Sequence, residues 1–270
     1  MNATPITPTT RPSGASALRS IGLIATRNAK TVARVPSMLV SAAIVPVLMI
    51  VLMSQVFRGI AANPAFPVGL DYIDYLTPAI LAMVVIANAS NSAVGIASDL
   101  STGMLDRLRA MPVRSWTVFV GRSAADVLVS IGQVALVIAV AVVLGFAPDG
   151  SIPELLAGLG LILFLGLAFN GLFMIFGTAI RNPESVNAAA SALLFPLLFV
   201  SSAFAPPETM PDWMRATAEV NPLSLVADAS RGLFAGAPSS SDILAALLGT
   251  TAVLVIGTIA ASHAYRRVSS

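Results

Sequence analysis

The chain lacks cysteine, and it has a single histidine, His263, and a single lysine, Lys30. Without cysteine it can form neither a disulfide nor a thiolate metal site, and one histidine leaves little for histidine ligation or catalysis. A P-loop requires a lysine that follows a glycine and binds phosphates. Lys30 instead follows Asn28 and Ala29, so the chain has no Walker A motif. Any ATP-driven process therefore needs an ATPase on another polypeptide.

Charge is also scarce. Charged residues make up 10% of the 270 residues, whereas soluble proteins contain about 25%. Six stretches between consecutive charged residues are long enough to cross a bilayer, which takes about 20 apolar residues. They cover residues 35–57, 75–98, 127–148, 155–180, 185–207 and 243–265. Because these runs lack the alternation of barrel strands, we predict an all-α, polytopic membrane protein with six transmembrane helices.

Basic residues divide unevenly between the predicted loops. With a cytoplasmic N-terminus, only Arg58, Arg215 and Arg231 fall in outer segments. The twelve basic residues of the inner segments are Arg11, Arg19, Arg27, Lys30, Arg34, Arg107, Arg109, Arg114, Arg122, Arg181, Arg266 and Arg267. Because cytoplasmic loops carry the excess of Arg and Lys, we expect both termini to be cytoplasmic.

Two segments precede the first span. Residues 1–14 are rich in Thr and Pro, which predicts a disordered cytoplasmic tail without the apolar region of a signal peptide. In residues 15–35, the basic side chains lie within an arc of about 80° on a helical wheel, mostly opposite apolar ones. They are Arg19, Arg27, Lys30 and Arg34. This pattern predicts an amphipathic helix on the inner leaflet, with a solvated tail as the alternative.

The segment from Asp99 to Arg122 is the one long charged segment between two long apolar runs. Its apolar residues recur at helical spacing, and its charged residues fall elsewhere on the wheel. The apolar residues are Met104, Leu105, Leu108 and Met111, and the charged ones are Asp106, Arg107 and Arg109. Pro112 disfavours helix at Met111. We therefore predict a short cytoplasmic helix that either lies on the lipid headgroups or docks on a soluble partner.

Residues 206–241 are too long for a plain connector between two spans. A first short amphipathic helix follows Pro211, and Asn221-Pro222 supplies an N-cap followed by proline at the first helical position. The spacing predicts a second helix that ends at Phe234 and carries an i,i+3 ion pair. We therefore expect an external helical hairpin, whose marked residues are Asn221, Pro222, Asp228 and Arg231.

Polar side chains within the spans have two interpretations. They are hydrogen-bonding groups between helices, which is the commoner role, or they line a substrate path. The candidates are Asn88, Asn91, Gln133 and Asn170. Arg122 and Asp126 are four residues apart at the inner end of the third span, and they predict a structural ion pair.

Two local motifs resemble a known family. The sequence GMLDRLRAMP from Gly103 to Pro112, followed by Gly121-Arg122, resembles the permease subunits of type-2 ABC exporters, in particular the daunorubicin/doxorubicin-resistance branch. The sequence NPLSLVADASRGLFAG at 221–236 resembles the second hallmark of that family, which lies in a re-entrant external hairpin before the last span. The family also carries an amphipathic helix before its first span.

The resemblance implies that residues 36–270 form a type-2 ABC permease domain in the cytoplasmic (inner) membrane. It also implies a coupling helix that contacts a separate ATPase subunit. The residues of that helix would be Gly103, Met104, Leu105, Asp106, Arg107, Leu108, Arg109, Met111 and Pro112. ATP and Mg would bind the partner, and this chain would hold no cofactor or metal and no catalytic residue.

A second permease copy, or a similar chain, would complete the exporter that the resemblance implies. Its substrate would be a small amphiphilic or apolar molecule such as a drug, an antibiotic or another natural product, and no nucleic acid is expected. Lipid and glycan exporters share the fold.

Other classes of membrane protein have less support. An ion-coupled secondary transporter needs ionisable groups near the midplane, and none lies within the six runs. An intramembrane serine protease is disfavoured because G-x-S begins only at Gly14 and Gly121, outside the spans. A non-transporting scaffold would leave the cytoplasmic helix and the external hairpin without a purpose.

Overall fold

The computed structural model describes residues 36–57, 59, 70–101, 115–180 and 182–269. Every regular element in these ranges is a helix, so the predicted all-α class is confirmed. The long helices are α2 (Pro36–Val56), α3 (Tyr72–Ser101), α5 (Ser115–Val143), α6 (Ile152–Ala179), α7 (Pro183–Phe199) and α10 (Ser240–Ser269). The short ones are η2 (Pro207–Thr209), α8 (Asp212–Ala218) and α9 (Pro222–Phe234). The predicted tail 1–14, the amphipathic helix 15–35 and the segment Gly103–Pro112 lie outside the described residues.

Four helices are long and apolar enough to cross a membrane. They are Tyr72–Ser101, Asp126–Val143, Ile152–Ala179 and Ser240–Ala260. Two further apolar helices, Ile44–Val56 and Pro183–Phe199, are shorter. Each of the six predicted runs overlaps one of these helices, and six spans remain a prediction. In the fifth run, 185–207, the helix ends at Phe199 and the following residues are irregular.

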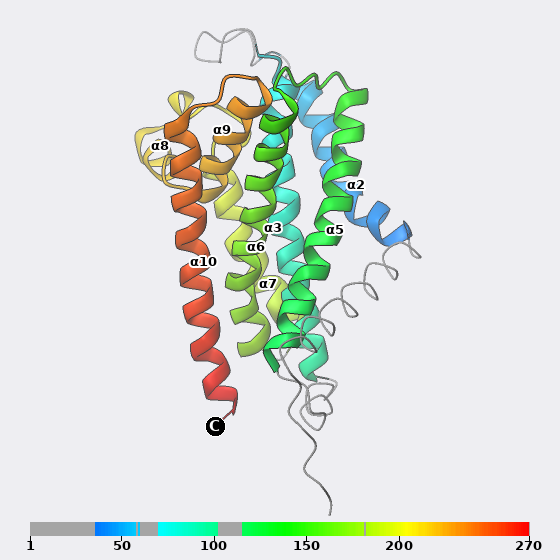
Figure 1. Cartoon of the computed structure of the whole chain (residues 1–270), viewed down its shortest axis with the longest axis vertical. Coiled ribbons are helices and arrows are strands. Elements are labelled where there is room, and N and C mark those ends of the chain that lie inside the picture. Colours follow the sequence, from blue (N-terminus) through cyan, green and yellow to red (C-terminus); the bar gives the residue numbers. More distant parts are fainter. Residues whose placement is uncertain (1–35, 58, 60–69, 102–114, 181, 270) are drawn as a thin grey trace, which may run out of the picture.

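Helix α3 is the centre of the bundle and packs against α2, α5, α6, α7 and α9. Figure 1 shows that α3 begins at the upper end of the molecule, where α5 joins α6 and α9 joins α10. The turn between α6 and α7 and the C-terminus lie at the lower end. Residues 102–114 connect α3 to α5 in the sequence, so both helices lead into the predicted coupling segment.

Glycines bring α6 against its two main neighbours. A Cβ placed on Gly166 would lie 2.8 Å from Cβ of Val85 in α3, and one on Gly177 would lie 2.6 Å from the Ala93 carbonyl oxygen. On the other side, a Cβ on Gly257 of α10 would lie 2.6 Å from the backbone nitrogen of Leu172. Because lipid provides no hydrophobic force between helices, association depends on this close van der Waals contact.

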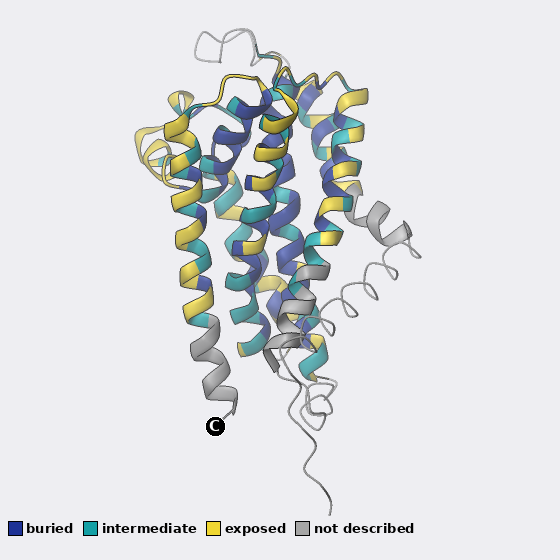
Figure 2. Ribbon diagram, in the orientation of Figure 1, coloured by how far each residue is buried: buried dark blue, intermediate teal, exposed yellow. Residues whose placement is uncertain are grey.

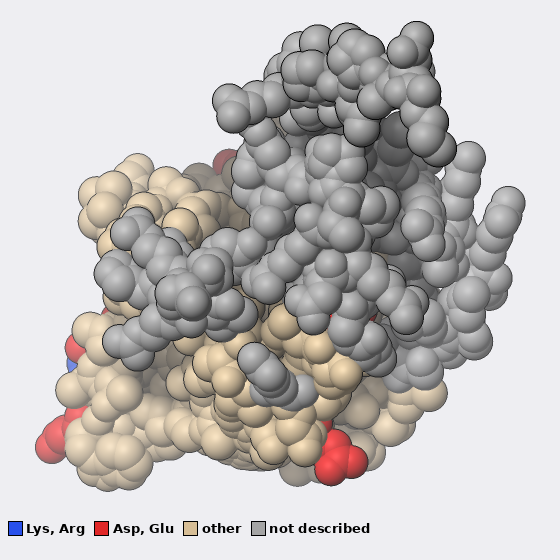
Figure 3. Space-filling model, turned by 90° about the horizontal axis from the view of Figure 1, so that it is seen from below, with Lys and Arg blue, Asp and Glu red and all other residues tan. Residues whose placement is uncertain are grey.

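The flanks of the bundle are apolar. Large hydrophobic side chains are exposed along α2, α5 and α10, for example Val143 and Ile256, and Figure 2 shows exposed residues on the outward faces of α5 and α10. Seen from below, the described surface is almost entirely uncharged, and its few acidic side chains lie near the edge (Figure 3). The exposed apolar flanks are typical of a bundle surrounded by hydrocarbon.

Replacement of Gly177 by alanine should destabilise the bundle. Its new methyl group would meet the Ala93 backbone, which cannot swing aside as a side chain can, and such overpacking costs about 1–3 kcal/mol. Gly160 in the same helix has no heavy atom within 4 Å in the described chain. Gly160→Ala should therefore be neutral, or stabilising by up to about 1 kcal/mol. Thermal unfolding of both variants in detergent measures the difference, and equal melting temperatures would contradict this packing.

Candidate functional site

Helices α7 and α9 share one capping residue. The Asn221 side-chain amide donates hydrogen bonds to the carbonyl oxygens of Leu197 (2.7 Å) and Val200 (2.6 Å), at the end of α7. Its Oδ1 accepts a hydrogen bond of 2.9 Å from the backbone N–H of Leu223, in the first turn of α9. Pro222 occupies the first helical position, where no N–H is needed. The Asn-Pro signal predicts the start of α9, and the same asparagine also caps the end of α7.

Arg231 binds the irregular chain that follows α7. Its Nε donates to the carbonyl oxygen of Tyr75 at 2.7 Å, and its Nη2 donates to those of Ser202 at 2.9 Å and Ala203 at 3.4 Å. Its Nη1 donates to the Ser202 hydroxyl at 3.2 Å and to the Asp228 carboxylate. One guanidinium therefore fastens α9 to both α3 and the segment after α7, which the planar fork of arginine allows.

Two tyrosines of α3 bind the same segment. The Tyr75 hydroxyl donates to the carbonyl oxygen of Ser202 at 2.7 Å, and the Tyr72 hydroxyl donates to that of Phe204 at 3.1 Å. Irregular backbone within a membrane bundle is tolerated only where its polar groups find partners in the protein. We call Tyr72, Tyr75, Ser202, Asp228 and Arg231 the Arg231 cluster.

The positive charge of Arg231 is buried but compensated. Its side chain is 8% exposed, its guanidinium carbon lies 3.6 Å from the centre of the Tyr75 ring, and it is paired with Asp228. Asp228 also accepts a hydrogen bond of 3.0 Å from the Ser202 hydroxyl. A buried cation is costly unless it is paired and fully hydrogen-bonded, and this arrangement provides both. The i,i+3 pair expected from the sequence is thus part of a larger network.

An open hollow of about 600 Å³ lies beside the Arg231 cluster, and this volume is within the range of small-molecule sites. Its carboxylates come from the α5–α6 loop, η2, α9 and α10, and they are Asp149, Glu208, Asp228 and Asp242. Their charge favours cations over anions in the hollow. No group of three Asp, Glu, His or Cys side chains in the described ranges is arranged to hold a metal ion.

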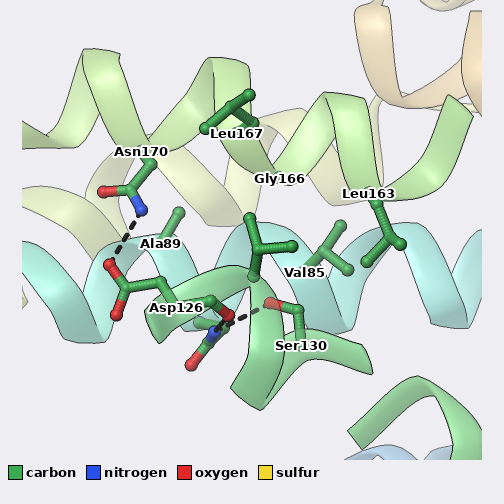
Figure 4. Close-up of a pocket in the computed structure, with 10 residues that line it drawn as sticks. Val85, Ala89, Asp126, Ser130, Leu163, Gly166, Leu167 and Asn170 are labelled. Carbon is green, nitrogen blue, oxygen red and sulfur yellow. Dashed lines mark hydrogen bonds between the residues drawn. The ribbon is translucent and has the colours of Figure 1, made fainter. Parts of the chain in front are cut away.

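A second polar centre joins α3, α5 and α6. Oδ2 of Asp126 in α5 accepts hydrogen bonds from the Ser92 hydroxyl of α3 (2.6 Å) and the Asn170 amide of α6 (2.9 Å). The Asn88 amide donates to the main-chain oxygen of Asp126 at 3.0 Å and to the Ser130 hydroxyl at 2.8 Å. Figure 4 shows Asn170 and Asp126 facing one another across the space between their helices. We call Asn88, Ser92, Asp126, Ser130 and Asn170 the Asp126 cluster.

The structure brings together two of the four polar residues singled out in the spans. Asn88 and Asn170 meet in the Asp126 cluster, next to a cavity of about 10 Å³, which has room for about one water molecule. Gln133 is buried, with its Oε1 unpartnered among the described residues, and Asn91 is exposed. The side chain of Arg122 lies outside the described residues, so its pairing with Asp126 remains a prediction.

Sequence reasoning missed several partners in both clusters. Ser130 follows Asp126 by one helical turn, and this i,i+4 spacing is a signal that could have identified it. Tyr75 and Ser202 gave no such signal, because they are 127 residues apart in the chain. The residues marked in the hairpin come together at the break between α7 and α9. The coupling-helix residues, Gly103–Pro112, lie outside the described ranges.

Known proteins share this sequence pattern. A family model described as ABC-2 type transporter matches residues 19–235. The daunorubicin resistance ABC transporter permease protein DrrB1 of Streptomyces coeruleorubidus is 27% identical over 208 residues, which are 77% of this chain and 72% of the relative. A probable doxorubicin resistance ABC transporter permease protein of Mycobacterium tuberculosis is 25% identical over 233 residues, 86% of this chain and 82% of the relative. A probable multidrug ABC transporter permease of Escherichia coli is 23% identical over 199 residues, 73% of this chain and 53% of the relative.

Replacement of Arg231 by methionine should strongly destabilise the protein, because it removes the guanidinium that binds three carbonyl oxygens and the Asp228 carboxylate. Loss of one member of a fully buried pair costs about 3–5 kcal/mol, and we expect the lower end of this range because the Asp228 side chain is 42% exposed. Arg231→Lys should restore little of the lost stability, because an ammonium group cannot reproduce the planar set of donors of the guanidinium. Arg215, which pairs with Glu219 and has a side chain 48% exposed, is the matched control, and Arg215→Met should cost at most about 1 kcal/mol. Unfolding curves in detergent test this, and equal losses would contradict the assigned role of Arg231.

Proposed function

The chain belongs to the ABC-2 type transporter family, and from this premise we propose that it exports small amphiphilic or apolar molecules across the cytoplasmic membrane. It is a multi-pass membrane permease and not itself an ATPase. The observation that carries the proposal is the family match, because residues 19–235 include helices α2 to α9. ABC-2 permeases pair with ATPase subunits, so ATP and Mg belong on that partner.

The substrate class is inferred from the relatives. Three of them, at 23–27% identity, carry names that refer to daunorubicin, doxorubicin or multidrug transport. We therefore propose a drug, an antibiotic or another natural product as the cargo of this chain. Lipid or glycan export by the same fold is the alternative within the family.

The ATPase contact is proposed at the predicted helix within Gly103–Pro112. Leu105 and Leu108 would enter a socket on the ATPase, and Arg107 and Arg109 would pair with acidic groups there. The excess of basic residues in the predicted inner segments supports a cytoplasmic position for this helix and for both termini. ATP-driven closure of two ATPase subunits would push on the helix, tilt the spans as rigid bodies and open a path between two permeases.

The central test is purification of the tagged chain in mild detergent from the membranes of its own host. We expect a P-loop subunit to co-purify and the preparation to hydrolyse ATP. In inverted vesicles, ATP should drive uptake of daunorubicin, which serves as the first probe because a relative is named after it. A chain that purifies alone, without ATPase activity, and transports only with a proton or sodium gradient would contradict the proposal and favour an ion-coupled transporter.

Replacement of Leu105 by aspartate should abolish export and release the ATPase subunit while membrane insertion remains intact, because a carboxylate cannot enter an apolar socket. Ala110→Asp is the matched control. It introduces the same charge on the opposite side of the predicted helical wheel and should retain the subunit. Co-purification and vesicle uptake measure both variants, and a Leu105→Asp protein that still exports would refute the assignment.

A further inference from the structure

Asp126 joins three helices through one residue. Its carboxylate binds Ser92 of α3 and Asn170 of α6, and its main-chain oxygen accepts from Asn88 of α3. Figure 4 shows the contact between Asp126 of α5 and Asn170 of α6. Hydrogen bonds to an ionised acceptor are shorter and roughly twice as strong as neutral ones. The contact of 2.6 Å from Ser92 is of this short type.

The rest of the described contact surface of α5 restricts the rotation and depth of this helix much less than the Asp126 cluster does. Toward the upper end, the buried face of α5 continues as Gln133, Val134, Val137 and Ala141. Only Gln133 among these is polar, and its Oε1 has no partner among the described residues. Apolar surfaces slide and rotate against one another easily in lipid, because the hydrocarbon competes equally well for them. By contrast, α3 and α6 are pressed together at Gly166 and Gly177. The rotation and depth of α5 relative to this pair are therefore set mainly by the Asp126 cluster.

The position of Asp126 along α5 relates the Asp126 cluster to the proposed ATPase contact. Helix α5 begins at Ser115 and α3 ends at Ser101, so both helices flank the proposed ATPase contact. Asp126 lies about three helical turns, about 16 Å, into α5. A displacement applied between Ser101 and Ser115 enters the bundle through two helices, and Asp126 is where these two are bonded to each other and to α6.

We propose that Asp126 is a positioning residue that makes α3, α5 and α6 move as one body when the ATPase acts on the permease, an inference that rests on the proposed function. Without it, α5 would move independently of α3 and α6, which are held to one another by their glycine contacts. The displacement would then change the distances between helices and would not move the three helices together.

This coupling can be measured with spin labels. Because this chain has no native cysteine, the introduced cysteines are the only labelling sites that it contributes to the complex. Spin labels at Leu128→Cys in α5 and Ala179→Cys in α6 report the distance between these helices, and both positions are exposed. The measurement uses the full permease–ATPase complex with and without a non-hydrolysable ATP analogue. In the parent we expect the same distance in both states. In Asp126→Ala we expect a nucleotide-dependent shift of at least about 2 Å, the size of helix shifts in allosteric proteins.

Two further variants separate positioning from simple loss of stability. The exchange Asp126→Asn with Asn170→Asp preserves both the total charge and a donor–acceptor pair between α5 and α6, and it should abolish the nucleotide-dependent shift that Asp126→Asn alone produces. Thr77→Val is the matched control, because the Thr77 hydroxyl is buried and bonds the Ile73 carbonyl of its own helix. This control should show no shift.

The outcomes are distinct. A shift in Asp126→Ala that the exchange removes supports the inference. An α5–α6 distance that changes with nucleotide in the parent, or is equally unaffected in Asp126→Ala and Asp126→Asn, overturns it. If Asp126→Ala does not assemble with the ATPase, the double exchange is compared with Asp126→Asn and Asn170→Asp alone. A double exchange whose α5–α6 distance shifts with nucleotide as much as in both single variants overturns the inference. Failure of the parent chain to retain any ATPase subunit overturns the proposed function itself.

Discussion

A backbone carbonyl that is buried in a helical bundle needs a donor from the protein, and the chain after Phe199 presents several such groups. The structure resolves this constraint with side chains from elsewhere. Asn221 binds the last carbonyls of α7, Arg231 binds those of Ser202 and Ala203, and two tyrosines of α3 bind those of Ser202 and Phe204. A helix may break at such a depth only if each exposed group finds a partner in this way. The positions of α3, α7 and α9 relative to one another follow from these bonds, and so does the buried position of the Arg231 charge.

Helix α3 takes part in both polar clusters. Near its start, Tyr72 and Tyr75 bind the irregular segment after α7, and about four to five turns further on Asn88 and Ser92 bind α5. The rest of its buried surface is mostly apolar and includes Val85 and Ala93, which lie against the glycines of α6. Polar bonds thus fix the orientation of α3 at two places, and the glycine contacts fix its distance from α6. In a family whose members transmit the action of an ATPase across a membrane, a rigid central helix is a suitable reference for the movement of its neighbours.

Much of this architecture follows from local sequence, because charge spacing marks apolar runs and Asn221-Pro222 marks a helix start. The ion pair of Asp228 with Arg231 was likewise accessible from spacing alone. The end of α7 was not, because residues 200–205 contain no charge, glycine or proline, and nothing local distinguishes them from a continuing span. The partners of Arg231 were equally hidden, since Tyr75 is 156 residues away in the chain. The exposed position of Asn91, in contrast to buried Asn88 only three residues earlier, depends on which helices surround α3 and could not be read from composition. Local chemistry therefore predicts elements, while their breaks and their polar partners depend on the assembled bundle.

The shared cap at Asn221 has a consequence for how this protein can vary. Residues 201–220 leave the helical path and return to it at nearly the same point, because one side chain holds both ends. They form, in effect, a closed loop inserted into a helix. The entropy of closing such a loop grows only with the logarithm of its length, so its far part, around Met210 and Pro211, can be lengthened, shortened or exchanged at little cost while the bonds at its base persist. The surface around this loop can thus be remodelled without moving the helices beneath it, and a reporter or epitope inserted there should leave the bundle intact.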